Sequence, residues 1–327
     1  MPISIRSMFL AACAACAVLA TLPAQARDFR SSDIHPADYP TVKAVEYMGQ
    51  LLKERSGGKL GVKTFPNGAL GNERDTIEQI KLGGVDMMRI NVAPLNNVVP
   101  ETIVPALPFL FRSEDHMHAA LDGPVGDEIL KAMQSQGMVG LAFYDSGARS
   151  LYTARKPVKT LADVKGMKIR VQQSDLFVSM IQALGANPTP MPYGEVYTAL
   201  KTGIVDAAEN NWPSYESSRH FEAAKNYSLT EHSMAPEILA FSKRIWDKLP
   251  AEDQTMIRQA AKDSVPEMRR LWHEREAKSR QVVEAAGAQV VKLENRQEFV
   301  DAVRPVYEKF AGTPALKSMI ERIEATN

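Results

Sequence analysis

One stretch, from Gly166 to Tyr215, restricts the possible folds more than any other part of the chain. It contains a short apolar strand ending in Arg170, a helix, a proline-flanked turn, a second helix and another apolar strand that runs into Glu209–Pro213. Strands and helices that alternate in this way form mostly parallel sheets covered by helices. The chain is therefore predicted to be an α/β protein.

The same alternation extends over most of the sequence. Helices are expected at Pro40–Arg55, Glu73–Leu82, Glu114–Ser135, Asp175–Leu184 and Glu195–Lys201. Strands are expected at Leu60–Phe65, Val85–Ile90, Met138–Phe143, Met167–Val171, Ile204–Ala208 and Glu237–Phe241. The fourth helix has Ser174 as its expected N-cap and Gly185 at its C-terminal end, residue types that favour these positions.

From Pro250 onward the sequence is mostly helical. Pro250 suits the first position of a helix, and Pro266 is expected to kink or split the long helical segment that follows. A strand is then expected at Ala288–Val291, and two last helices at Arg296–Phe310 and Ala315–Ile323.

An internal similarity suggests two structural units. Lys81–Asp86 matches Lys201–Asp206 at a shift of 120 residues, and the same shift relates Asn91 to Asn211. In both segments a helix ends at a glycine and a short strand follows. Since ligands of α/β sheets bind beyond the carboxyl ends of strands, each unit would direct one amide toward a shared cleft. A chance similarity between two helix–glycine–strand segments remains the alternative.

The first 26 residues are typical of a secretory signal. Arg6 precedes an apolar run from Met8 to Thr21, and Ala24–Ala26 provides a small-residue cleavage site. The run is shorter than the roughly 20 apolar residues that span a bilayer. Both cysteines, Cys13 and Cys16, fall within this segment, so the mature chain is predicted to have no disulfide and no cysteine-ligated metal.

Composition and missing motifs exclude several classes of function. The chain has 39 basic and 39 acidic residues, and this balance gives no indication of nucleic-acid binding. The phosphate-binding loop, the H-E-x-x-H zinc helix and the G-x-S-x-G elbow are absent from the sequence. His116 and His118 are two positions apart and would lie on different faces of a helix, so solvated histidines are expected rather than a metal site. No cofactor and no metal are expected.

The strand Gly166–Arg170, the capped helix after it and the motif Glu209–Pro213 together resemble the solute-binding subunits of tripartite ATP-independent periplasmic (TRAP) transporters, the DctP family. The resemblance extends over about Phe29–Ala325. It implies a two-lobed periplasmic-binding-protein fold, in which each lobe is a mixed, mostly parallel sheet flanked by helices. Crossing strands would join the lobes, and a long C-terminal helix would brace both. Lobe I is expected at 27–149 plus about 235–265, and lobe II at 150–234 plus about 266–327.

The resemblance also assigns a role to two arginines. In the family, the arginine that ends the Gly166–Arg170 type of strand pairs with the substrate carboxylate, and Arg149 matches a second arginine that some members direct at the same anion. Guanidinium groups remain charged and bind carboxylates through two parallel hydrogen bonds. The alternatives are a surface arginine at a strand end for Arg170 and a hinge or loop arginine for Arg149.

Other candidates follow from residue type together with the resemblance. Amides suit ligands rich in hydroxyl groups, and the family places an asparagine that matches Asn210 in the cleft. Strand alternation would turn Asn211 and Glu209 elsewhere, although Asn211 remains a candidate. Tyr193 and Trp212 are aromatic candidates for stacking on a sugar ring, with a place in the core as the alternative.

Three candidates come from the first lobe. Asn91 follows a predicted strand, Glu73 opens a predicted helix, and His35 lies where the first strand of the family meets the cleft. Glu73 would accept hydrogen bonds from ligand hydroxyls, or it would only interact favourably with the helix dipole. A plain loop histidine is the alternative for His35.

These residue types favour a ligand with one carboxylate and several hydroxyl groups. The segments Ser32–Pro36 and Tyr39–Val42, together with Glu209–Pro213, resemble family members that bind hexuronates. This resemblance implies a hexuronate such as glucuronate or galacturonate, with a C4-dicarboxylate, sialic acid or another acid as alternatives. The resemblance implies a periplasmic protein that docks transiently on the small and large TRAP permease subunits, and a monomer is expected. An exported lyase or hydrolase of acidic sugars and a chemoreceptor-coupled sensor are the more distant alternatives.

Overall fold

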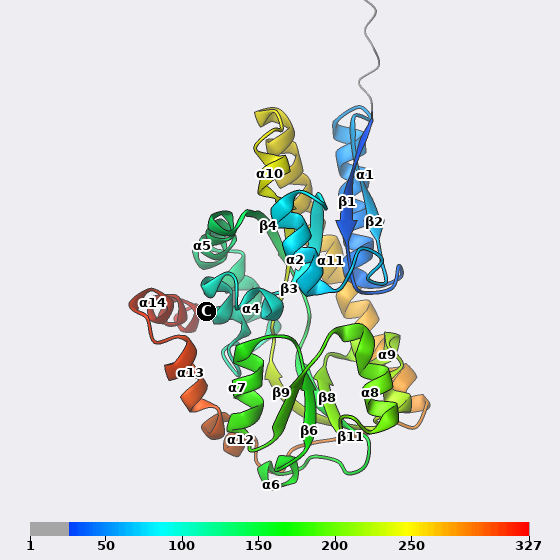
Figure 1. Ribbon diagram of the computed structural model, residues 1–327, viewed down its shortest axis with the longest axis vertical. Coiled ribbons are helices and arrows are strands. Elements are labelled where there is room, and N and C mark those ends of the chain that lie inside the picture. The colour runs from blue at the N-terminus through cyan, green and yellow to red at the C-terminus, as the bar shows by residue number, and fades with distance from the viewer. Residues whose placement is uncertain (1–25, 327) are drawn as a thin grey trace, which may run out of the picture.

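A computed structural model describes residues 26–326, so the predicted secretory signal lies outside the described residues except for Ala26. The described chain forms two sheets at opposite ends of an elongated molecule (Figure 1). Among residues 26–326, no helix combines the length and the apolar character that crossing a bilayer requires.

The first sheet has five strands in the order β2-β1-β3-β10-β4. Its strands are β1 (Arg27–Ser32), β2 (Leu60–Phe65), β3 (Met87–Asn91), β4 (Met138–Tyr144) and β10 (Glu237–Ser242). The strand β1 is parallel to β2 and β3, whereas β10 is antiparallel to β3 and β4. The helices associated with this sheet are α1 (Pro40–Arg55), α2 (Glu73–Leu82), α3 (Val92–Leu95), α4 (Glu114–Leu121), α5 (Pro124–Ala132) and α10 (Lys243–Trp246).

The second sheet has six strands in the order β11-β9-β5-β8-β6-β7. Its strands are β5 (Arg149–Thr153), β6 (Lys168–Val171), β7 (Asn187–Pro190), β8 (Ala207–Asn210), β9 (Asn226–Ser233) and β11 (Gln289–Val291). Parallel pairs, such as β6 with β7 and β8, occur beside antiparallel pairs of β5 with β8 and β9. The associated helices are α6 (Leu161–Val164), α7 (Asp175–Ala183), α8 (Val196–Thr202) and α9 (Trp212–Ser217).

Two short segments and one long helix connect the sheets. The chain passes from β4 to β5 through residues 145–148 and returns from β9 to β10 through residues 234–236. The helix α11 (Ala251–Ala285, 35 residues) packs against α1 and β4 on one side and α9 on the other. This architecture confirms the predicted two-lobed α/β fold with crossing strands and a long C-terminal helix.

Three more helices end the described chain: α12 (Arg296–Ala302), α13 (Arg304–Phe310) and α14 (Pro314–Glu324). The first two pack on β9 and α7 of the second sheet, whereas α14 packs on α5 and on the 3₁₀ helix Pro100–Ala106 beside the first sheet. The C-terminal part of the chain therefore contacts both halves of the molecule.

Two predicted helices are in fact interrupted. The segment Glu114–Ser135 forms α4 and α5 because Gly123 is extended and Pro124 starts a new helix instead of continuing the old one. It ends in a 3₁₀ turn at Met133–Gln136. The segment Arg296–Phe310 likewise divides into α12 and α13 around Val303.

The long helix is not split at Pro266, where a kink or a split was expected. Pro266 lies inside α11, and the helix is not divided there. Both Pro266 and Lys262, whose carbonyl loses its usual partner, are exposed, so that water can satisfy the carbonyl. The expectation of a split at Pro266 was wrong.

Several elements were not predicted, among them β1, β5, β7, β9 and α9. The strand β7 contains Pro188 and Pro190, which an edge strand tolerates because its outer N–H groups need no partner. Ser174 occupies the N-cap position of α7 but makes no capping bond. Its hydroxyl instead lies 3.0 Å from the side-chain amide of Asn96.

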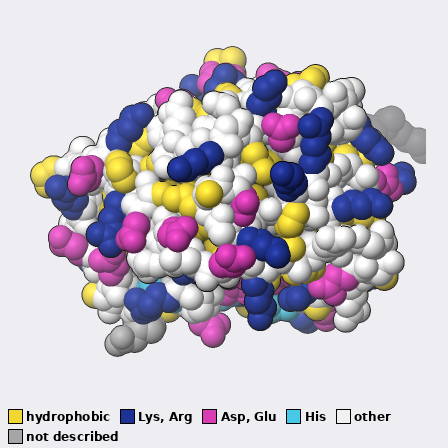
Figure 2. Space-filling model, turned by 90° about the horizontal axis from the view of Figure 1, so that it is seen from below, with side chains coloured by type: hydrophobic (Ala, Val, Ile, Leu, Met, Phe, Trp, Pro, Cys, Tyr) yellow, Lys and Arg dark blue, Asp and Glu magenta, His cyan; other side chains and the backbone are white. Residues whose placement is uncertain are grey.

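The lower surface of the molecule carries charges of both signs. Viewed from below, basic and acidic side chains are intermingled with small hydrophobic groups, without a field of one sign (Figure 2). This distribution agrees with the balanced composition of the chain.

Candidate binding site between the two sheets

Two adjoining cavities lie where the ends of β3, β6 and β8 approach one another. The outer cavity has a volume of about 250 Å³ and the inner cavity about 10 Å³, roughly the space of one water molecule. Both are lined by Ile34, Glu73, Arg170 and Tyr193. The inner cavity is lined in addition by His35, Arg89, Asn91, Arg149, Gln172, Asn210, Asn211, Ser214 and Glu237. Eight of the nine predicted site residues therefore meet around the inner cavity, and Trp212 is the exception.

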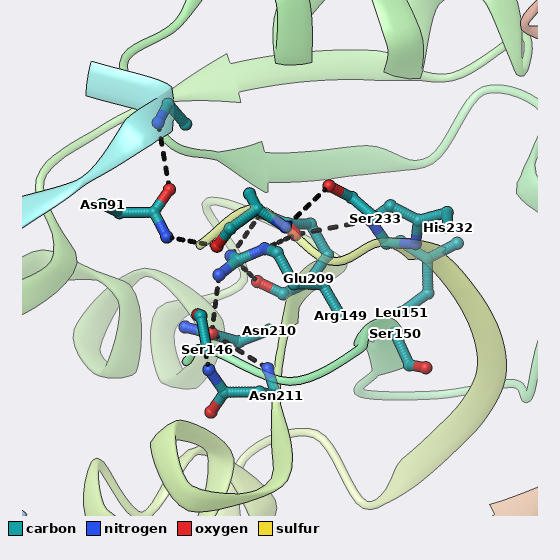
Figure 3. A network of polar contacts seen from close by, with 12 residues as sticks. Asn91, Ser146, Arg149, Ser150, Leu151, Glu209, Asn210, Asn211, His232 and Ser233 are labelled. Atoms are coloured by element: carbon teal, nitrogen blue, oxygen red, sulfur yellow. Dashed lines mark hydrogen bonds and ion pairs between the residues drawn. The ribbon is translucent and has the colours of Figure 1, made fainter. Parts of the chain in front are cut away.

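Arg149, at the start of β5, is held by a bidentate ion pair. Its Nε donates to Glu209 Oε2 at 2.6 Å, and its Nη2 donates to Glu209 Oε1 at 2.8 Å and to the Glu209 carbonyl at 2.9 Å. Its Nη1 donates to Asn210 Oδ1 at 2.9 Å. Figure 3 shows this network at the junction between the sheets. Most of the donors of Arg149 are therefore occupied by the protein itself.

The partner of Arg149 was not predicted. Glu209 was expected to turn away from the cleft, and its carboxylate is completely buried against Arg149. Burial alone would raise the pKa of Glu209, but Arg149 and a hydrogen bond from His232 outweigh burial and lower this pKa to about 2. Glu209 therefore remains ionised and compensates the charge of Arg149.

A second buried ion-pair network was also missed from the sequence. Arg89 on β3 donates from Nε to Asp33 Oδ2 at 2.8 Å and from Nη1 to Glu237 Oε2 at 2.8 Å, and it also pairs with the second oxygen of Asp33. An arginine inside the buried apolar run Met87–Ile90 was the available signal, because such a charge requires partners. Burial would lower the pKa of Arg89, but the charges of Asp33 and Glu237 outweigh it and raise this pKa.

Arg170, on β6, differs from both other arginines. Only 2% of its surface is exposed, yet it forms no ion pair with any residue in 26–326. Its Nε and Nη2 both donate to the Met191 carbonyl, at 3.1 and 2.7 Å, and its Nη1 has no partner among the same residues. Burial lowers the pKa of Arg170 from its ordinary value because it penalises the charged form. This guanidinium is the one uncompensated cation of the inner cavity within the described chain.

Glu73 faces the cavity from the first residue of α2. Asn72 caps this helix by accepting hydrogen bonds from the backbone N–H groups of Arg74 and Asp75. The Glu73 carboxylate accepts one hydrogen bond, from the Asn91 N–H at 3.4 Å. Burial raises the pKa of Glu73 to about 7, with the nearby Arg89 acting in the opposite sense.

His35 and Tyr193 form an aromatic wall of the inner cavity. The ring of His35 stacks on Tyr39, with centroids 3.8 Å apart, and meets Tyr193 edge to face at 5.1 Å. Burial and the charges of Arg89 and Arg149 lower the pKa of His35 well below its usual value, so the ring is neutral at neutral pH. The hydroxyl of Tyr193 donates to the Ser214 carbonyl at 3.1 Å, which fixes the ring beside Arg170.

The two asparagines related by the internal similarity act as helix caps. Asn91 Oδ1 accepts from the Ala93 N–H at 3.0 Å and begins α3, and Asn211 Oδ1 accepts from the Ser214 N–H at 2.8 Å and begins α9. Both Nδ2 hydrogens of Asn91 are also used, by Glu237 and the Ala235 carbonyl. Asn211 lines the inner cavity, although strand alternation had predicted that it would turn elsewhere.

Asn210 retains free hydrogen-bonding capacity. Its Oδ1 accepts from Arg149 and from the Asn211 N–H, both at 2.9 Å. Its NH₂ group donates to none of residues 26–326 and lies in the lining of the inner cavity. It is therefore suited to donate to a ligand oxygen.

Gln172 was not identified from the sequence. It is buried, lines the inner cavity, and its Oε1 has no partner in the described chain. The available signal was its spacing, because residues two apart on a strand share a face and Arg170 precedes it by two. Gln172 therefore adds an unused acceptor beside the uncompensated guanidinium.

Trp212 and His116 both lie in surroundings that differ from those predicted for them. Trp212 lies outside both cavities and stacks on Tyr227 with centroids 3.7 Å apart, as the core alternative describes. His116 is buried rather than solvated, with its Nε2 2.8 Å from the Ile323 carbonyl. No group of metal-ligating side chains was found among residues 26–326.

Comparison with known proteins places this architecture in a family. The model of the bacterial extracellular solute-binding proteins, family 7 (DctP), matches residues 31–313. A TRAP periplasmic solute-binding protein from Bradyrhizobium sp. BTAi1, solved in complex with α/β-D-galacturonate, is 70% identical with a TM-score of 0.91, covering 92% of this chain and 100% of that one.

Two further solved structures are similar at the same coverage, 92% of this chain and 100% of the other. The protein from Xanthobacter autotrophicus Py2, with bound β-D-galacturonate, is 57% identical with a TM-score of 0.90. The protein from Roseobacter denitrificans, with bound β-D-glucuronate, is 43% identical with a TM-score of 0.89. The chain therefore belongs to bacterial extracellular solute-binding protein family 7, the DctP family of TRAP-transporter solute-binding proteins.

Proposed function

We propose that this protein captures a hexuronate, with D-galacturonate as the first candidate, in the cavity between its sheets. As a member of its family it binds solutes for transport and is not an enzyme. Two solved relatives with 57% and 70% identity hold galacturonate, which supports this choice. After its secretory signal is removed, the protein would work in the periplasm and deliver the ligand to the small and large subunits of a TRAP permease.

The observation that carries the proposal is the uncompensated charge of Arg170. A buried cation without a counter-ion is costly, and a bound carboxylate would remove that cost while forming charge-assisted hydrogen bonds. Arg89 and Arg149 already have carboxylate partners. One free guanidinium favours a ligand with a single carboxylate over a dicarboxylate.

The remaining lining suits the hydroxyl groups of a sugar acid. The Asn210 NH₂ group supplies a donor, Gln172 Oε1 supplies an acceptor, and the carboxyl group of Glu73 faces them across the cavity. His35 and Tyr193 would contact the apolar face of the ring. Asn91, Asn211 and Arg149 would shape the site mainly by holding its walls.

The ligand would be enclosed by closure of the two lobes. We assign 27–149 plus about 235–265 to lobe I and 150–234 plus about 266–327 to lobe II, with the crossing segments as the hinge. Glu73 and His35 then belong to lobe I, and Arg170 and Asn210 to lobe II, so a ligand that contacts both favours the closed form. The closed monomer would be the form that docks on the permease.

The test is a thermal-shift titration of mature protein that has been unfolded and refolded to remove any bound ligand. A ligand that binds only the native state raises the melting temperature by mass action. We expect a large shift with D-galacturonate or D-glucuronate and none for Arg170→Gln. Arg155→Gln, which replaces an exposed arginine in the bend after β5, is the matched control and should behave like the wild type.

Other outcomes would redirect the proposal. A shift with C4-dicarboxylates or sialic acid alone would keep the binding role and discard the hexuronate. No shift with any organic acid, in a folded protein, would contradict anion binding. Product formation by substoichiometric protein would contradict a purely binding role.

A further inference from the structure

The charges around the inner cavity balance one another before any ligand is present. Two of the three buried guanidinium groups are ion-paired, and these pairs contain three carboxylates. The positive groups are Arg89, Arg149 and Arg170, and the negative ones are Asp33, Glu237 and Glu209. The net charge of this set is therefore zero.

Glu73 is a fourth carboxyl group, outside these pairs. It forms no ion pair with residues 26–326, and its one hydrogen bond is with the Asn91 N–H. It lines both cavities together with Arg170, which approaches from the other sheet. The other charged or titratable groups that face this part of the cavity are Arg89 on β3, Glu237 on β10, His35 after β1, and Tyr193 and Glu195 beside α8.

A bound anion changes the net charge around the inner cavity. Because the set is neutral, a ligand carboxylate on Arg170 already brings its net charge to −1. An ionised Glu73 would add a second negative charge inside the same enclosed space, where like charges repel strongly. A neutral Glu73 avoids this repulsion and also gains an O–H donor, which an ionised carboxylate lacks.

We propose that Glu73 is protonated when a hexuronate occupies the cavity, so that above neutral pH the protein takes up about one proton with each ligand that it binds. The inference deepens the proposed function and rests on it. It makes Glu73 a specificity-determining residue: its neutral carboxyl group can both donate to and accept from a ligand hydroxyl, whereas a second ligand carboxylate directed toward α2 would leave the carbonyl oxygen of Glu73 without a donor and would add another negative charge to the cavity.

The direction of the pH dependence follows from this linkage. The pKa of Glu73 is about 7 without ligand, and a bound anion raises it further. Below pH 7 Glu73 is already protonated in the free protein, so affinity should be nearly constant. Above pH 7 the proton must come from solution, and affinity should fall by up to about tenfold per pH unit. The carboxyl group of the sugar acid stays ionised throughout this range.

Titration calorimetry with D-galacturonate would count the proton directly. Ligand-stripped mature protein is titrated at pH 6 and pH 8.5, in pairs of buffers that differ in ionisation enthalpy. We expect proton uptake approaching one per ligand at pH 8.5 and clearly less at pH 6. Binding at pH 8.5 without proton uptake would overturn this inference alone, whereas no binding by the wild type at either pH would overturn the proposed function as well.

Three variants identify the group that takes up the proton. Glu73→Gln keeps the shape of the side chain and cannot ionise, so it should bind with no proton uptake and with an affinity that is independent of pH. Glu78→Gln is the matched control, because Glu78 lies on the same helix α2, is exposed and lines neither cavity, and it should retain the wild-type dependence.

Glu276→Gln tests the main competitor. Glu276 lies in α11 beside the crossing segment at Gly147, and burial raises its pKa to about 7 as well. Loss of proton uptake in Glu276→Gln with retention in Glu73→Gln would place the proton at the hinge and overturn the inference. If Glu73→Gln is folded but does not bind, the proton count of the wild type and of Glu276→Gln decides the question.

Discussion

Arg149 and Arg170 are equally buried and lie on the same sheet with only β8 between their strands, yet their surroundings are opposite. Arg149 meets Glu209 in a bidentate pair, while the Met191 carbonyl is the only partner of Arg170 among residues 26–326. The charge of Arg149 is compensated within the protein. The charge of Arg170 is left to be compensated by a bound anion. Burial of an arginine therefore does not indicate its role, and the presence or absence of a counter-ion does.

The largest expected effect concerns stability at the paired site. Arg149→Met should lower the free energy of unfolding by about 3–5 kcal/mol, because Glu209 would be left buried without a counter-ion. Denaturant unfolding of the ligand-free protein measures this change. The double variant Arg149→Met/Glu209→Met should recover most of the loss.

A surface ion pair provides the control for this variant. Arg55 pairs with Asp263 at 2.6 Å with both side chains about one-third exposed, and Arg55→Met should cost less than about 1 kcal/mol. Equal costs for Arg55→Met and Arg149→Met would mean that the buried pair is no more important than an exposed one.

The next effect is an acid dependence of stability caused by Glu209. Its pKa in the folded protein is about 2, below the ordinary value of 4.5. The stability from this ionised group is therefore fully present above pH 4.5 and is lost as the pH falls from 4.5 toward 2. The contribution is up to about 3 kcal/mol. Between pH 4.5 and pH 2, the free energy of unfolding should change less with pH in Glu209→Gln than in the wild type. An equal pH dependence in both proteins would contradict the assignment.

A smaller expected effect, on ligand affinity, separates the contribution of the charge of Arg170 from that of its geometry. Arg170→Lys keeps a positive charge but loses the planar fork that binds both carboxylate oxygens. We expect affinity for galacturonate to fall about tenfold, or about 1.4 kcal/mol, and to remain measurable by calorimetry. Unchanged affinity would mean that Arg170 acts only as a point charge.

The smallest expected effect is a change in the free energy of unfolding at Arg170, and its sign is opposite to the change expected at Arg149. Arg170→Met removes an uncompensated buried charge, so the ligand-free protein should gain about 1 kcal/mol of stability. Its melting temperature should no longer respond to galacturonate. A clear loss of stability in the ligand-free variant would mean that Arg170 has a compensating role in the fold, as Arg149 does.

Local sequence patterns predicted much of the fold. The bounds of α1, α2 and β2 agree with their predicted ranges, since each has a clear apolar pattern with proline, an N-cap or glycine at its ends. The errors occurred where a single residue overrides the pattern, as Pro124 does between α4 and α5. Short strands such as β5 were missed because five residues carry little periodicity and depend on their neighbours in the sheet.

Most residues of the site could be predicted from the sequence, whereas their ion-pair and hydrogen-bond partners were harder to predict. Arg170, Glu73 and Asn210 were candidates from their positions next to strand and helix ends together with the family resemblance, and all three line the inner cavity. The aromatic Trp212 was selected by type and lies in the core, because an indole beside a binding motif satisfies either pattern.

The sequence by itself determined the α/β class, the order of most helices and strands, and the position of an arginine that ends a strand. Only the tertiary structure decided which buried charges are paired. Arg149 and Glu209 are 60 residues apart, and Arg89 and Glu237 are 148 residues apart. Local structure depends on neighbours along the chain, whereas the energy of a buried charge depends on groups that folding brings within a few ångströms. For that reason the free guanidinium of Arg170 could be recognised only after every other charge around it had been placed.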